Sequence, residues 1–140
     1  MRVIIDAENA VAGRLASRVA RELLSNKTVA VINAEKAVIS GNPAFTQEFF
    51  RQKTARGDPV RGPFYPRTPE RILRRIIRGM LPRRQFRGKN AYNRLRVYTG
   101  VPPIFAGQTP VRIKDAENML TSKYMTLGVL AQRLGAAKRW

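Results

Sequence analysis

The chain has no cysteine and no histidine among its 140 residues. Their absence excludes thiol nucleophiles, imidazole general bases, disulfide bonds and nearly every kind of zinc site. No segment approaches the roughly 20 apolar residues of a membrane helix, and the first residues, MRVIIDAENA, hold too short an apolar run for a signal peptide. We therefore expect no metal, no cofactor and no membrane association.

Acidic residues are also scarce, with 9 Asp and Glu against 27 Lys and Arg and a net charge of +18. A compact state with this charge repels itself, so a polyanion is the natural partner. Of the 27 cations 20 are arginine, which binds phosphate bidentately and stacks on bases better than lysine does. Residues 51–100 hold 15 basic and 2 acidic side chains, whereas residues 1–50 hold 6 and 5. The middle of the chain is therefore the expected contact surface.

The apolar fraction of 44% is sufficient for a packed core, and the length fits one domain over residues 1–140. Continuous apolar runs predict short strands at 3–5, 28–32 and 38–40. Apolar residues at helical spacing predict helices at 12–25 and 44–54. This order of elements is typical of an α/β fold with a parallel sheet that is buried on both faces.

The composition changes after residue 54. Residues 55–69, ARGDPVRGPFYPRTP, predict an arm without regular secondary structure, because each proline disfavours helix for the residue before it. Thr68, Pro69 and Glu70 are a typical helix start, with a capping hydroxyl and proline in the first position. We then expect a helix at 70–80, a loop at 82–89, a short helix at 90–95, a fourth strand at 96–98, and a C-terminal segment 123–140 that begins with a helix at 123–134.

The outward face of helix 70–80 carries only arginine. Like charges at this spacing destabilise a helix, so the face is unfavourable unless an anion lies across it. A merely solvated face is the alternative, but such faces usually mix both signs of charge. The arm and the loop add further cations. The predicted nucleic-acid contacts are Arg56, Arg61, Arg67, Arg71, Arg74, Arg75, Arg78, Arg83, Arg84, Arg87 and Lys89.

Apolar residues inside this basic segment suggest how it is held. Met80 and Leu81 end the apolar stripe of the helix, and Pro82 turns the chain outward, so the cations of the loop would be anchored before binding. Gly79 and Gly88 would permit close approach to a phosphate backbone. Three aromatic residues lie among the arginines and could stack on splayed bases or pack on the protein's own surface: Phe64, Tyr65 and Phe86.

The sequence contains no enzyme motif. The turn DAENAVAGRLAS after the first strand has one glycine, Gly13, where a dinucleotide fingerprint needs three. The close acidic pairs Asp6/Glu8 and Asp115/Glu117 are interpreted as capping or turn residues. Ser17 and Ser40 lack a histidine partner anywhere in the chain.

Four segments then resemble a known family: IIDAENAVAGRLAS (4–17), VAVINAEKAVISGN (29–42), RGPFYPRTPERI (61–72) and RGMLPRRQFRGKNAYNRLRVYTGVPP (78–103). In this order they resemble the large-subunit ribosomal protein thirteen family, in its archaeal and eukaryotic branch. The similarity covers roughly residues 1–105 and is looser beyond them.

The resemblance implies a three-layer α/β/α fold with a four-stranded parallel sheet and basic RNA-binding extensions. It implies a cytoplasmic ribonucleoprotein component of translation, not an enzyme. The expected partners are large-subunit rRNA and neighbouring large-subunit ribosomal proteins, with no small-molecule substrate and no homo-oligomer. Carried over to this chain, the motif adds Arg94 and Arg96 to the predicted rRNA contacts and leaves Met80, Leu81 and Pro82 structural.

Two other interpretations remain open from the residues alone. One is a free-standing nucleic-acid binder, such as a chromatin or regulatory protein. The other is an α/β enzyme that acts on a nucleotide or on RNA, against which the missing histidine, cysteine and phosphate-binding loop already count.

Overall fold

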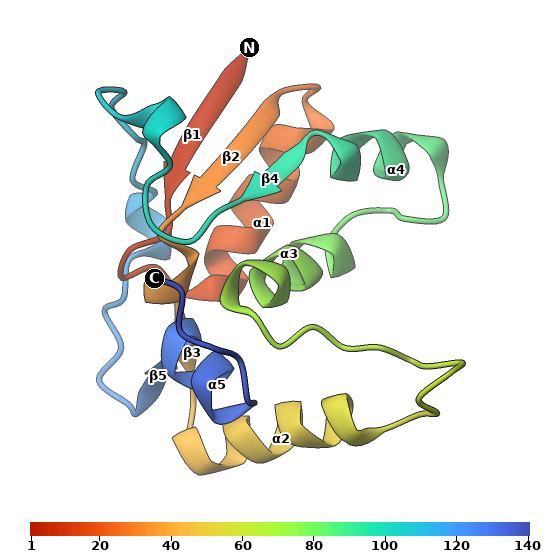
Figure 1. The fold of residues 1–140 in the computed structure, drawn as a ribbon. Helices are drawn as coiled ribbons and strands as arrows, with labels where there is room; N and C mark the ends of the chain where they lie inside the picture. Colours follow the sequence, from red (N-terminus) through yellow and green to blue (C-terminus); the bar gives the residue numbers. More distant parts are fainter.

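A three-stranded parallel sheet forms the centre of the computed structural model, which describes all 140 residues (Figure 1). The strands are β1 (Arg2–Asp6), β2 (Thr28–Ile32) and β4 (Leu95–Val97), in the order β1-β2-β4. Ile4 pairs with Ala30, and Ala30 pairs with Arg96 on the other side. The apolar runs at 3–5 and 28–32 therefore predicted their strands correctly, and the fourth predicted strand lies one residue earlier than expected.

Helices cover one face of this sheet. They are α1 (Ala12–Leu24), α3 (Pro69–Gly79) and α4 (Phe86–Asn93). Alternate strand residues such as Ile5, Val31 and Leu95 point into the same core as Leu15 of α1 and Ile72 of α3. The predicted helix at 12–25 and the predicted helix at 70–80 are both confirmed to within a residue or two.

The opposite face of the sheet has no helical layer, so the expected three-layer arrangement is wrong. Ile4, Ala30 and Ile32 point to this face and pack against Phe105. Phe105 belongs to a single 3₁₀ turn, η2 (Pro103–Phe105), in the proline-rich segment that follows β4. Phe105 and the neighbouring Tyr98 together cover this second face of the sheet.

The predicted strand at 38–40 is present, but it forms a separate two-stranded antiparallel sheet and does not join the parallel one. The strands of this second sheet are β3 (Val38–Ser40) and β5 (Tyr124–Thr126). The 3₁₀ turn η1 (Ala34–Lys36) carries the chain past the end of β1 before β3 begins. There the Val38 amide donates to the Ala10 carbonyl at 2.8 Å, beyond the sheet itself. β3 therefore lies beside residues that follow the end of β1, and it pairs with β5 instead of with β1.

The C-terminal helix is shorter than expected. α5 (Leu127–Arg133) begins only after β5, and the Thr126 hydroxyl accepts from the Val129 amide at its start. The apolar spacing of Leu127, Leu130 and Leu134 was interpreted correctly, but Tyr124 belongs to the strand. Another 3₁₀ turn, η3 (Lys114–Ala116), lies in the segment before β5.

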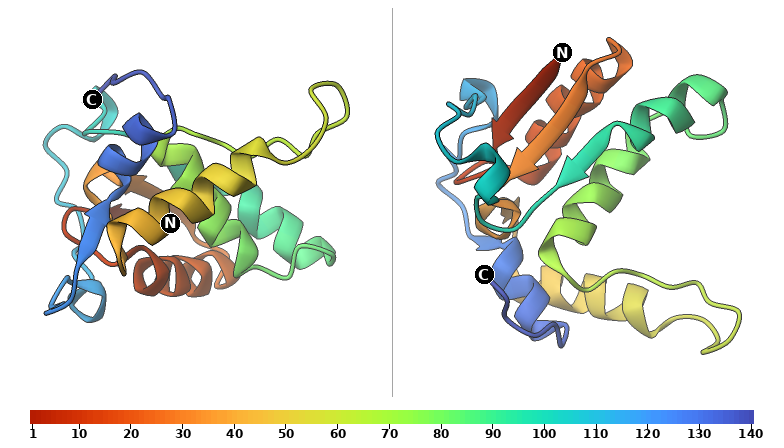
Figure 2. Two further views of the ribbon diagram at one scale, coloured as in Figure 1. Left: turned by 90° about the horizontal axis from the view of Figure 1, so that it is seen from below. Right: turned by 45° about the horizontal axis from the view of Figure 1, so that its top comes forward.

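The arm lies between α2 (Pro43–Ala55) and α3 and projects away from the rest of the molecule (Figure 2). It has no helix and no named strand, as the prolines predicted; its one β-bridge joins Asp58 to Gly62. α2 begins where the Asn42 side chain accepts from the Ala44 amide at 3.0 Å. It buries only Thr46 and Phe50. None of the α-helices combines the length and the apolar composition that a membrane-spanning helix needs.

Two local predictions in the basic region need correction. α4 begins at Phe86, four residues before the predicted start, so the second half of the expected loop is helical. Thr68 does occupy the position before α3, but its hydroxyl makes no capping bond and is buried without a partner. Proline in the first turn of α3 therefore accounts for the start of the helix without help from this hydroxyl.

Candidate nucleic-acid interface

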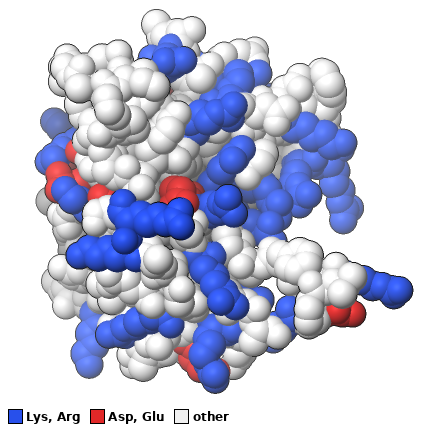
Figure 3. Space-filling model, in the orientation of Figure 1, with Lys and Arg blue, Asp and Glu red and all other residues white.

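Lys and Arg side chains gather around a notch between the arm and the part of the molecule that carries α4 (Figure 3). The salt bridges of the chain involve only five cations, which are Arg18, Lys27, Lys36, Arg51 and Arg112. None of the basic residues predicted as contacts is among them. Every basic residue predicted as a contact is therefore left without a carboxylate partner.

Four arginines of α3 form what we call the Arg face: Arg71, Arg74, Arg75 and Arg78. Two of them stack on aromatic rings. The guanidinium carbon of Arg74 lies 4.6 Å from the centre of the Tyr92 ring, and that of Arg75 lies 5.3 Å from the centre of the Tyr65 ring. Such cation–π contacts hold a guanidinium plane in place without neutralising its charge.

Crowding of like charges is visible at the end of the Arg face. Partial burial, and then repulsion from Arg75 and Arg83, lower the pKa of Arg78 from its ordinary value. Arginine stays protonated at neutral pH in spite of this shift. An anion that binds among these three arginines would relieve their mutual repulsion, so their positions favour anion binding.

The turn between α3 and α4 is fixed by packing. Leu81 is 6% exposed and belongs to the core, as expected, but Met80 is 43% exposed and is not part of the buried stripe. Gly88 is buried, and a Cβ at this position would lie 2.1 Å from the Pro82 carbonyl oxygen. Gly88 thus permits α4 to pack against the turn and does not face a phosphate, which corrects the sequence interpretation. Gly79, by contrast, has no atom near its Cβ position.

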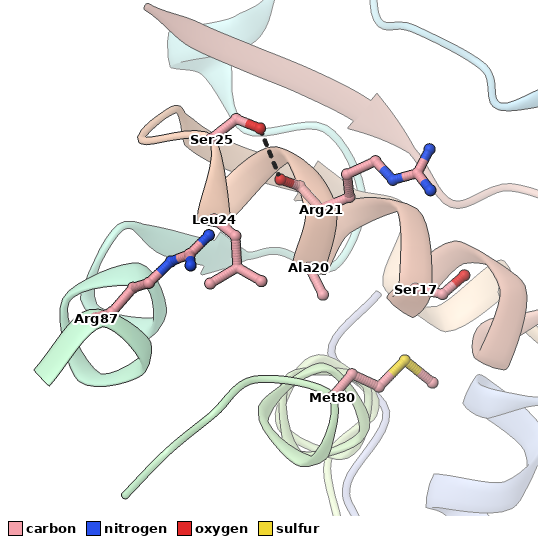
Figure 4. Close-up of a pocket in the computed structure, with 7 residues that line it drawn as sticks. All are labelled: Ser17, Ala20, Arg21, Leu24, Ser25, Met80 and Arg87. Atoms are coloured by element: carbon pink, nitrogen blue, oxygen red, sulfur yellow. Dashed lines mark hydrogen bonds between the residues drawn. The ribbon is translucent and has the colours of Figure 1, made fainter. Parts of the chain in front are cut away.

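A groove of about 420 Å³ lies between α1 and this turn (Figure 4). Met80 faces Ala20 across the groove, and Arg87 directs its guanidinium toward Leu24. Arg21 lies at its edge and, like Arg87, has no carboxylate partner. Sequence reasoning missed Arg21, because a cation on a solvated helix face gives no separate signal.

The three predicted stacking residues differ in their surroundings. Phe64 is 67% exposed and Phe86 is 78% exposed. Tyr65 is half-buried, and its ring meets that of Phe50 edge-on at 5.9 Å. Burial raises the pKa of the Tyr65 hydroxyl, although the nearby Arg75 and Arg78 act in the opposite direction. Tyr65 therefore packs on its own chain, whereas the two phenylalanines remain free for a partner.

Other predicted contacts lie away from the Arg face. Arg94 donates to the Leu23 carbonyl at 2.9 Å and to the Asn26 side chain at 3.2 Å, which ties β4 to the end of α1. Arg96 donates to the carbonyls of Asn93 and Leu95. The arm carries its three exposed arginines, Arg56, Arg61 and Arg67. The turn and α4 present Arg83, Arg84, Arg87 and Lys89, all exposed.

Asp6 and Asp115, one from each of the two close acidic pairs, have structural partners. The Asp6 carboxylate accepts from the Asn33 side chain at 2.9 Å and from the Glu8 amide at 3.0 Å, and it also pairs with Arg112. Asp115 pairs with Arg18. No group of three or more acidic residues comes together in a way that could hold a metal ion. Asp6 is thus a turn residue, as the sequence indicated.

A family model described as Ribosomal protein L13 matches residues 1–103, which is well over half of the chain. The chain belongs to the ribosomal protein L13 family. Among its relatives, Large ribosomal subunit protein uL13 of Methanopyrus kandleri is 48% identical over 136 residues, which cover 94% of this chain and 86% of the relative. The protein of the same name from Methanosarcina barkeri is 46% identical, with 95% and 97% covered. That of Thermoplasma acidophilum is 41% identical, with 94% and 97% covered.

The resemblance to the ribosomal protein thirteen family that the four sequence segments indicated is therefore confirmed. The prediction of an archaeal-type member agrees with these archaeal relatives. As a member of the family the chain is a structural constituent of the large ribosomal subunit and not an enzyme. This membership also decides against the free-standing binder.

Proposed function

We propose that the chain binds folded large-subunit rRNA in the notch, with the Arg face of α3 as its floor. The arm and the segment 83–89 would contact the RNA on either side. The observation that carries this proposal is the set of unpaired arginines on one face of a helix that is otherwise well packed.

The cations of this interface are held in position before binding. Arg74 and Arg75 are stacked on tyrosines, and the buried Leu81 fixes the turn that carries Arg83 and Arg84. Fewer degrees of freedom are then lost when phosphates arrive, which favours binding to a folded RNA. The intramolecular bonds of Arg94 favour a structural role for that residue, and Arg96 would contact RNA only from the other face of the sheet.

The test is a salt titration of binding to an in vitro transcript of archaeal large-subunit rRNA. The triple variant Arg74→Gln, Arg75→Gln and Arg78→Gln should lower the slope of log K against log salt by about 2–3, from roughly 0.7–0.9 for each phosphate contact. Its thermal unfolding should stay cooperative, because the replaced side chains lie opposite the buried stripe.

The matched control removes three other positive charges, with Arg18→Gln, Lys36→Gln and Arg51→Gln. Each of these cations pairs with an acidic residue outside the notch. Net charge falls by the same amount in both variants, so a general electrostatic attraction would change both slopes equally. That result, or an unchanged slope in the first variant, would overturn the proposal.

A further inference from the structure

We propose that one unstacked nucleotide of the bound RNA enters a cleft between the arm and α3, with its base against the exposed ring of Phe64 and its phosphate on the arginines. This inference rests on the proposed rRNA binding and specifies the chemistry of one part of that interface. The cleft has a volume of about 340 Å³. It is lined by Phe64, Tyr65, Pro66, Arg71, Arg74, Arg75 and Tyr92.

Three elements meet at this cleft. The arm supplies the aromatic pair Phe64 and Tyr65, α3 supplies the arginines, and α4 supplies Tyr92. Tyr92 was not among the predicted site residues, because nothing in the sequence distinguishes it from a tyrosine of the core. The cleft thus exists only in the folded chain, where the arm returns along α3.

The guanidinium groups at the cleft are oriented before any ligand binds. The guanidinium carbon of Arg74 lies over the Tyr92 ring and that of Arg75 over the Tyr65 ring. A cation–π contact does not use the N–H donors of a guanidinium, so these donors are available to a ligand. Arginine planes and aromatic rings are the surfaces on which unstacked RNA bases are bound, while the edges suit phosphate oxygens.

The arginines at this cleft have no anionic partner within the protein. No carboxylate of the chain pairs with Arg71, Arg74 or Arg75. Their positive charges are therefore available to an anion from outside the chain.

Size and exposure limit what can enter. A volume of 340 Å³ is near the lower end of small-molecule sites, which span about 300–1,000 Å³. A double helix cannot enter such a space, whereas one nucleotide can. Phe64 is 67% exposed, so a base can cover this ring without displacing another side chain. The combination of flat apolar rings with unpaired cations favours a nucleotide over an acidic peptide.

The experiment compares Phe64→Leu with the unaltered full-length chain on the same rRNA transcript. Leucine keeps an apolar side chain but removes the flat ring. Affinity should fall by about 5- to 150-fold, the usual effect of losing one stacked base, and the salt slope should not change. Chemical probing of the RNA should show one nucleotide that is unstacked with the unaltered protein and restacked with the variant.

Phe45→Leu is the matched control, since Phe45 is 72% exposed on α2 and does not line the cleft. It should bind as the unaltered chain does. If Phe64→Leu binds normally, or if no nucleotide changes its reactivity, the cleft does not hold a base, even though the Arg-face variant can still show its reduced salt slope. An unchanged slope in the Arg-face variant would instead remove the proposed function itself.

Discussion

Gly88→Ala is the sharpest test of how the turn between α3 and α4, which carries Arg83 and Arg84, packs against α4. Gly88 lies inside α4, where alanine would ordinarily stabilise the helix by about 1 kcal/mol. Here the new Cβ would lie 2.1 Å from the Pro82 carbonyl oxygen and 2.4 Å from the Pro82 carbonyl carbon. Real Cβ atoms essentially never come so close to backbone, so α4 or the turn must move.

The expected cost follows from this geometry. Overpacking costs about 1–3 kcal/mol, and a contact with backbone belongs at the upper end because no rotamer change relieves it. After the gain in helix propensity is subtracted, the variant should be less stable by about 2 kcal/mol. At about 4 °C for each kcal/mol in a chain of this size, its melting temperature should fall by about 8 °C.

Gly79→Ala provides the control, measured in the same thermal unfolding series by circular dichroism. Gly79 is also helical, but a Cβ there meets no atom within 4 Å. This variant should melt at or slightly above the temperature of the unaltered chain. If Gly88→Ala melts together with Gly79→Ala, the close approach of α4 to the turn at Pro82 does not exist.

Two further changes separate structural from RNA-binding roles. Leu81→Asp should destabilise the chain by roughly 4 kcal/mol or more in urea unfolding, because it buries an unpaired carboxylate, whereas Met80→Asp at the exposed neighbouring position should cost about 1 kcal/mol or less. Arg94→Gln should cost about 1–3 kcal/mol through its lost bonds to Leu23 and Asn26 while the salt slope of RNA binding stays the same; a reduced slope would show that Arg94 contacts phosphate.

Much of the fold could be predicted because its signals are local. Apolar spacing defines α1 and α3, proline at the first helical position marks the start of α3, and continuous apolar residues define β2. These three elements contribute 11 of the 25 buried residues of the main core. Each depends on neighbouring residues in the sequence and therefore needed no knowledge of the rest of the chain.

The errors in the fold arise where a distant segment decides the outcome. β3 and β5 are three residues each, and they pair with one another across more than 80 residues of the sequence. Tyr124 also lies at helical spacing from Leu127, so the strand was hidden in an apparent helix. Phe105 covers the second face of the sheet from an irregular segment with no periodicity. Pairing and covering of this kind cannot be seen in a local pattern.

The candidate site divides in the same way. The cations were visible as composition, but which of them remain unpaired became clear only from the positions of the carboxylates. Arg94 and Arg74 look alike in the sequence, yet one is bonded to α1 and the other stacks on Tyr92. The distinction depends on contacts between segments far apart in the chain.

The burial of apolar side chains on α3 outweighs the repulsion among its arginines. The Arg face contains four like-charge pairs at a spacing of three or four residues, which together cost about 1–2 kcal/mol. Ile72, Leu73 and Ile77 are each 0% exposed, and burying three such side chains contributes about 5–9 kcal/mol. Charge repulsion alone is therefore too small to displace the helix from the core. The arm has no comparable anchor, since only the half-buried Tyr65 and its neighbours attach it to the body. The Arg face is thus more firmly attached to the core than the arm is. The position of the arm therefore depends more strongly on a ligand bound between the arm and the Arg face.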